Sequence, residues 1–71
     1  MQQIQRKLGD RVRKLRSRKG WSQEEFAAVS GLHRTYIGAV ERGEKNLTVS
    51  TLHTLARTLG TSLAQLFRGI A

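Results

Sequence analysis

The amino-acid sequence predicts an all-α domain of five helices, and three observations carry that prediction. Apolar residues recur every three or four positions along most of the chain, as they do on one face of a helix. No stretch alternates apolar and polar residues for long enough to indicate a β-strand. Proline is absent, and each helical stretch is followed by a glycine, the residue that most readily adopts the left-handed conformation that ends many helices. These glycines are Gly20, Gly31, Gly43, Gly60 and Gly69.

Capping residues and apolar stripes place the individual helices. Ser22 is the clearest helix start, because Glu25 three residues later completes a capping box. The connections between helices are short, so residues 1–71 are expected to form a single domain. The five helices are expected over about residues 3–18, over 23–29, over 34–42, from 49 after the cap Thr48, and from about Ser62.

The composition limits the class of protein. The chain has 71 residues and no cysteine, so disulfides and thiolate metal sites are excluded. Its apolar runs are far shorter than the roughly 20 residues that span a bilayer. The first residues lack the apolar segment of a signal peptide. A cytoplasmic location is therefore expected.

The charge balance indicates a polyanionic partner. The formal net charge is +8, and eight of the thirteen Lys and Arg residues fall between Arg6 and Lys19, beside the single acid Asp10. The polyanion could be nucleic acid or an anionic membrane surface, because a basic domain can bind either. The alternative is a solvated basic face that only keeps a small protein in solution.

The second and third helices are expected to form a helix-turn-helix. They are joined by Ser30-Gly31-Leu32-His33, and two short helices with a tight glycine-containing turn describe this motif. The small Ala27 allows the two helices to approach closely. The residues available to fill the space between them are Leu32, Ile37 and Val40.

Several short motifs run through most of the chain: LGDRVRKLR (8–16), SQEEFA (22–27), SGL (30–32), RTYI (34–37), VERG (40–43) and LHTLARTLG (52–60). Together they resemble the phage-repressor family of helix-turn-helix proteins, the lambda Cro/cI or Xre type. Within that family, Arg34-Thr35-Tyr36, Asn46-Leu47-Thr48 and the short length look most like controller proteins of restriction–modification systems. The resemblance implies a sequence-specific transcriptional regulator that binds a palindromic operator in double-stranded DNA as a homodimer.

In such a fold the third helix lies in the major groove, with its first residues on base edges. Arg34 can make a bidentate contact to guanine, and Thr35 can offer a hydroxyl to a base and a methyl to thymine. Arg34 is otherwise poorly placed, because the helix dipole repels a cation at a helix start. Base contacts are therefore predicted for His33, Arg34, Thr35, Tyr36 and Ala39.

Gly38 is unexpected in the middle of so short a helix, because it costs about 1 kcal/mol relative to alanine. One interpretation is that its missing side chain lets the helix approach DNA closely. The other is that tertiary packing offsets the cost.

Phosphate contacts are predicted beside the base contacts. Gln23 begins the second helix, where backbone N–H groups and the helix dipole favour an anion. The other predicted phosphate contacts follow the third helix at Arg42, Lys45 and Asn46. Such contacts set register and affinity without reading sequence.

The family resemblance also implies roles for acidic residues. It pairs Glu41 with Arg16, which would join the first helix to the third. Some relatives use acids at the start of the second helix to contact RNA polymerase, which here are Glu24 and Glu25. Capping and the helix dipole also explain these two acids, and this second interpretation is favoured.

Dimerisation is expected through the end of the chain. A domain this small reads too few bases alone, and repressor-type domains bind as two-fold dimers. Controller-like relatives dimerise through their last helices. The interface residues are predicted to be Leu63, Leu66, Phe67 and Ile70, with completion of the monomer core as the alternative.

Other classes find less support. His33 and His53 are far apart in sequence, and paired carboxylates or a glycine-rich phosphate loop are absent, so neither catalysis nor a cofactor or metal is expected. Two alternatives remain open: an antitoxin-like subunit that binds both a protein and DNA, and a membrane-surface module based on the basic, amphipathic first helix.

Overall fold

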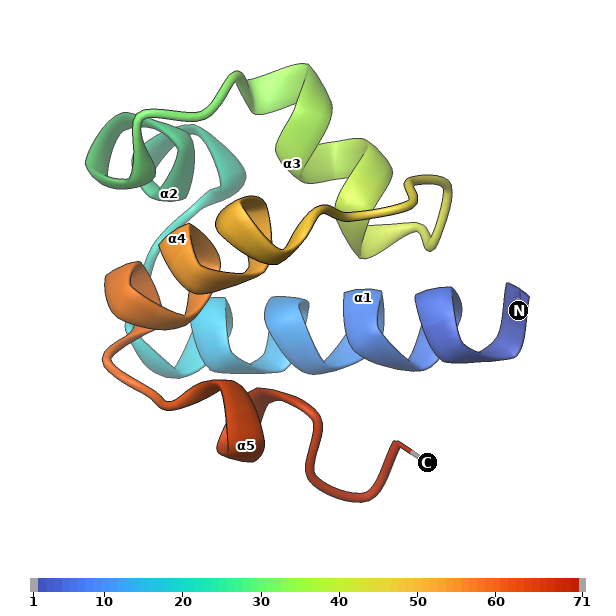
Figure 1. Ribbon diagram of the computed structural model, residues 1–71. Helices are drawn as coiled ribbons and strands as arrows, with labels where there is room; N and C mark the ends of the chain where they lie inside the picture. The colour runs from blue at the N-terminus through green and yellow to red at the C-terminus, as the bar shows by residue number, and fades with distance from the viewer. Residues whose placement is uncertain (1, 71) are drawn as a thin grey trace.

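The computed structural model describes residues 2–70 and confirms the all-α fold, with no strand among those residues (Figure 1). The helix α1 packs against α3, α4 and α5, while α2 packs against α3 and α4. In Figure 1, α3 and α5 lie on opposite sides of α1. The helices are α1 (Gln2–Arg18), α2 (Gln23–Ser30), α3 (Arg34–Glu41), α4 (Val49–Leu59) and α5 (Leu63–Leu66).

One core joins all five helices. Each helix supplies one large side chain with less than 2% of its surface exposed, which are Val12, Phe26, Ile37, Leu55 and Leu66. The burial of these apolar side chains is the main force that holds such short helices in place, because helices of this length are marginal on their own.

Local signals set the starts of α2, α4 and α5 as predicted. Ser22 and Glu25 form the expected capping box at the start of α2. Thr48 caps α4, and Ser62 forms a second capping box with Gln65 at the start of α5. All five glycines predicted to end helices have positive φ angles. The turn between α2 and α3 is therefore closed by Gly31 in the left-handed conformation.

The contact between α1 and α3 depends on Gly9. A Cβ atom at this position would lie 2.3 Å from the carbonyl oxygen of Val40 and 2.7 Å from that of Glu41. Real side chains do not come so close to backbone atoms, so any larger residue forces the two helices apart. Gly9 thus fixes the distance between α1 and the helix that carries the predicted base contacts.

The end of the chain differs from the prediction. The helix α5 ends at Leu66, and residues 67–70 form turns in which Ile70 N–H donates to Phe67 C=O at 3.1 Å. Leu66 is fully buried and Ile70 is 6% exposed, so both belong to the core of the protomer. This corrects their assignment to a dimer interface. Leu63 and Phe67 remain half-buried.

Most of the apolar face of α1 also lies inside the protein, although Ile4 near its start is exposed. Leu8 and Val12 are buried in the core. A helix that inserts into a membrane surface needs such a face to be available, so the structure does not favour the membrane-surface interpretation. Within the described residues, none of the helices has the length and apolar character that crossing a bilayer requires.

Candidate nucleic-acid interface

The start of α3 presents two exposed side chains, Arg34 and Thr35. His33 precedes them as the N-cap, and its Nδ1 accepts a hydrogen bond from the Thr35 N–H at 3.3 Å. This bond satisfies one of the helix's unpaired N–H groups and leaves Nε2 of His33 for other partners. The first turn of α3 is therefore ordered by its own cap, while its polar side chains reach solvent.

A groove of about 500 Å³ lies beside this turn. Six of its lining residues are ones for which DNA contacts are predicted from the sequence: His33, Thr35, Tyr36, Ala39, Arg42 and Lys45. The seventh is Glu44, for which no role was predicted. Ala39 is only 7% exposed, so the apolar surface that it offers to a partner is small. The groove brings residues from α3 and the following loop onto one surface.

The Glu41 carboxylate connects α1, α2 and α3. Arg16 donates to it twice, from Nε to Oε2 at 2.7 Å and from Nη2 to Oε1 at 3.0 Å, so the predicted ion pair is present. Arg16 also donates to the carbonyl of Trp21 at 2.7 Å. The hydrogen bond to Glu41 raises the pKa of Arg16, with desolvation opposing it and the charge of Glu41 adding to it. The pair therefore holds α3 against α1.

Gln23 joins the same network. Its side-chain Nε2 donates to Glu41 Oε1 at 3.1 Å. The side chain was predicted to donate to a phosphate, so part of its hydrogen-bonding capacity is used inside the protein. The Glu25 N–H in the first turn of α2 donates to the Ser22 hydroxyl, and the N–H groups of Gln23 and Glu24 can still bind an anion.

The two acids that start α2 differ in their contacts. Glu25 Oε1 accepts from the Ser22 N–H at 2.8 Å, so its carboxylate is engaged in capping. Glu24 is exposed in the same turn. Both acids are exposed, but capping engages the carboxylate of Glu25, so Glu24 is the acid left free for a second protein.

The loop after α3 carries charged groups on the rim of the groove. Arg42 Nε donates to Glu44 Oε2 at 3.0 Å, and this bond raises the pKa of Arg42 and lowers that of Glu44. Lys45 Nζ lies 5.7 Å from the centre of the Tyr36 ring, within the range of a cation–π contact. Asn46 accepts a hydrogen bond from the side chain of Gln5.

Gly38 provides space for side chains of this surface. A Cβ atom at Gly38 would lie 3.1 Å from Arg42 Nη1 and 3.6 Å from Gln23 Oε1. The position is buried. The space that an alanine methyl would fill thus adjoins two residues predicted to contact phosphates.

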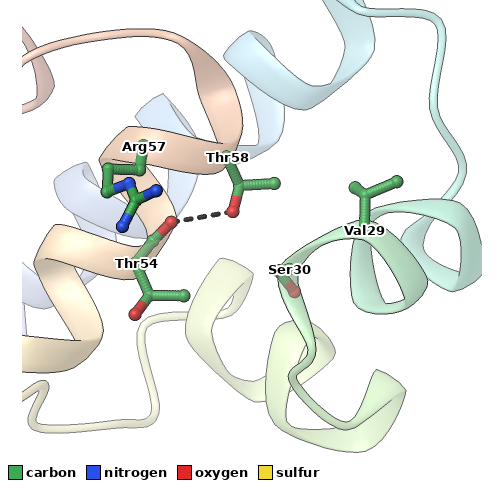
Figure 2. Close-up of a pocket in the computed structure, with 5 residues that line it drawn as sticks. All are labelled: Val29, Ser30, Thr54, Arg57 and Thr58. Atoms are coloured by element: carbon green, nitrogen blue, oxygen red, sulfur yellow. Dashed lines mark hydrogen bonds between the residues drawn. The ribbon is translucent and has the colours of Figure 1, made fainter.

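A second hollow lies between α2 and α4 (Figure 2). Its walls are formed by Val29, Ser30, Thr54, Arg57 and Thr58, of which Arg57 alone is charged. The Thr58 hydroxyl donates to the Thr54 carbonyl at 2.8 Å, drawn as the dashed line in Figure 2. This arrangement holds neither a nucleophile with a base nor a set of metal ligands. No cluster of three metal-binding side chains occurs among the described residues either.

Comparison with known proteins identifies the fold. A model of the helix-turn-helix family HTH_3 matches residues 12–66. The chain belongs to this family. The control protein C.SmaI of Serratia marcescens is 54% identical over 59 residues, which make up 83% of this chain and 70% of that protein.

Solved structures of the family agree closely with this chain. The restriction–modification controller protein C.AhdI from Aeromonas hydrophila matches with a TM-score of 0.83 and 45% identity, over 87% of this chain and 90% of that one. The controller C.Esp1396I, solved as a tetramer in complex with its natural 35 base-pair operator, matches with a TM-score of 0.83 and 34% identity, over 94% and 88%. In this HTH_3 protein, α2 and α3 are the helix-turn-helix.

Proposed function

We propose that this protein is a transcriptional regulator of a restriction–modification system that binds a two-fold symmetric operator as a homodimer. One observation carries the proposal: the groove beside the start of α3 collects six of the residues predicted to contact DNA, next to the exposed Arg34. Its relatives C.SmaI and C.AhdI, named as control or controller proteins, support the same function. Such a regulator acts in the cytoplasm.

The proposed docking places the first turn of α3 in the major groove. Arg34 reads guanine, and Thr35 and Tyr36 contact neighbouring bases or the backbone. The start of α2 faces a phosphate on one side, through backbone N–H groups and Gln23. Lys45 faces the backbone on the other side. The network around Glu41 holds α3 in the orientation that these contacts need.

Dimerisation is proposed through the surface of α5. Leu63 and Phe67 are half-buried, and their exposed parts are available to a second copy. Because α5 lies across α1 from α3, pairing there leaves both recognition helices uncovered (Figure 1). Two helices related by a two-fold axis then read half-sites about one helical turn apart. Glu24 is proposed as a contact for RNA polymerase, because it is exposed beside the DNA-facing end.

A binding selection on random-sequence duplexes with the purified protein tests this function. The expected result is a consensus with two-fold symmetry. Arg34→Ala should lose preference at one base in each half-site, at a cost of about 1–3 kcal/mol. Arg57→Ala, which removes the same charge from the hollow between α2 and α4, should keep the consensus. An enriched pool without symmetry, or an Arg34→Ala variant with unchanged preference, would contradict the proposal.

A further inference from the structure

We propose that Glu44 limits the attraction of this protein for DNA of any sequence by neutralising Arg42. The inference rests on the proposed function, because it concerns the same DNA-facing surface. It assigns to Glu44 an effect on the affinity for DNA of any sequence, although its carboxylate makes no favourable contact with a phosphate itself.

The geometry places both charges on the surface that would face DNA. Arg42 and Glu44 line the groove beside α3, and their Nε and Oε2 atoms are 3.0 Å apart. Their side chains are 59% and 56% exposed, so neither charge is hidden from a phosphate backbone. The guanidinium lies against Gly38, where the absence of a side chain leaves room for it.

Glu44 differs from the other four acids of the chain. Glu41 is nearly buried against Arg16, and Glu25 caps α2. Asp10 pairs with Arg13 on α1, and Glu24 lies in the first turn of α2. Among the residues that line the groove, Glu44 is the acid.

The expected consequence follows from how DNA binds cations. Sequence-independent affinity comes from Lys and Arg side chains that neutralise phosphates and release counterions. A cation that already has a neighbouring carboxylate contributes less to this release. The net charge of +8 already includes Glu44, and the excess of Lys and Arg favours binding to DNA of any sequence. Phosphate contacts contribute to the binding of operator and random DNA alike, so this pairing weakens both, and the preference for the operator comes from base contacts such as those proposed for Arg34 and Thr35.

The test measures binding to a random-sequence duplex at several salt concentrations. Glu44→Gln should bind at least about threefold more tightly than the wild type at low salt, with a slope of log affinity against log salt steeper by about 0.9 per protomer. In an Arg42→Gln background, adding Glu44→Gln should change the logarithm of the affinity by less than half of the change that it causes in the wild type. Asp10→Asn makes the same change in net charge at another exposed pair, and it should have a smaller effect than Glu44→Gln.

Two results would overturn the inference. An unchanged affinity of Glu44→Gln would show that the carboxylate does not oppose binding. An equal gain with and without Arg42 would show that Glu44 repels phosphates directly and does not act through Arg42. If the wild type binds no duplex even at low salt, DNA binding itself is refuted, and this result is distinct from the other two.

Discussion

Replacing Glu41 by glutamine tests the connection between the recognition helix and the rest of the fold. The substitution keeps the shape of the side chain but removes its charge. It also turns one oxygen, which accepts from Arg16 or Gln23, into an NH₂ group that faces those donors. Arg16 is left as a largely buried cation without a counter-charge, since the two side chains are only 13% and 3% exposed.

The expected loss of stability is large for a protein of this size. Breaking one partner of a buried pair costs about 3–5 kcal/mol, and the lower figure applies because Arg16 keeps some contact with water. A domain of 71 residues has a total stability of about 4–10 kcal/mol. With a urea dependence of about 1 kcal/mol per molar, a loss of 3 kcal/mol lowers the unfolding midpoint by about 3 M.

Urea unfolding can be followed by far-UV circular dichroism and by the fluorescence of Trp21, the single tryptophan. Glu44→Gln is the matched control, because it breaks an exposed pair and should leave the midpoint unchanged. A loss below about 1 kcal/mol for Glu41→Gln would mean that the pair behaves like a surface pair. The account of Glu41 as the connection between three helices would then be wrong.

Three further predictions concern single residues. Gly9→Ala should destabilise by about 2 kcal/mol or more in urea melts, because its methyl meets backbone atoms of α3. Gly38→Ala should be neutral or stabilise by up to about 1 kcal/mol, because its methyl lies in ordinary contact with Gln23 and comes close only to the flexible side-chain end of Arg42; a clear loss would contradict this. The pKa of Glu44, lowered from 4.5 by Arg42, should rise towards that value in Arg42→Ala, as measured by NMR titration. Since that pKa is lowered in the folded state, any stabilisation by Glu44 is present above pH 4.5 and lost as the pH falls through the folded value.

The elements that the sequence predicts well are those specified by neighbouring residues. Ser22 and Glu25 are three positions apart, so their capping box is visible in the sequence and confirmed in the structure. The same holds for the glycine that closes the turn of the helix-turn-helix. The ion pair between Arg16 and Glu41 spans 25 positions, and it was predictable only through the family resemblance.

Features that depend on the path of a loop, on the contact of two helices or on a very short helix could not be predicted from the sequence. The pairing of Glu44 with Arg42 requires the chain to turn after α3, and no periodic pattern indicates it. Gly9 was noted only within a motif, because a close approach of two backbones leaves no mark on local sequence. The family resemblance predicted a dimer interface for all four apolar residues at the end of the chain. The helix α5 is too short for its apolar pattern to show which of them face inward.

In α3, the residues that pack against the core differ from the exposed residues that would contact DNA, and this has a consequence for how such proteins diversify. The fully buried contacts that anchor this helix to the scaffold come from its inner side, chiefly through Ile37, Val40 and Glu41, while Tyr36 is partly packed against the core. Arg34 and Thr35 lie outside that set and are exposed. Exchanging these two residues should therefore retarget the protein to a different DNA sequence without a penalty in folding, so new recognition can arise by substitution at positions that the fold leaves unconstrained.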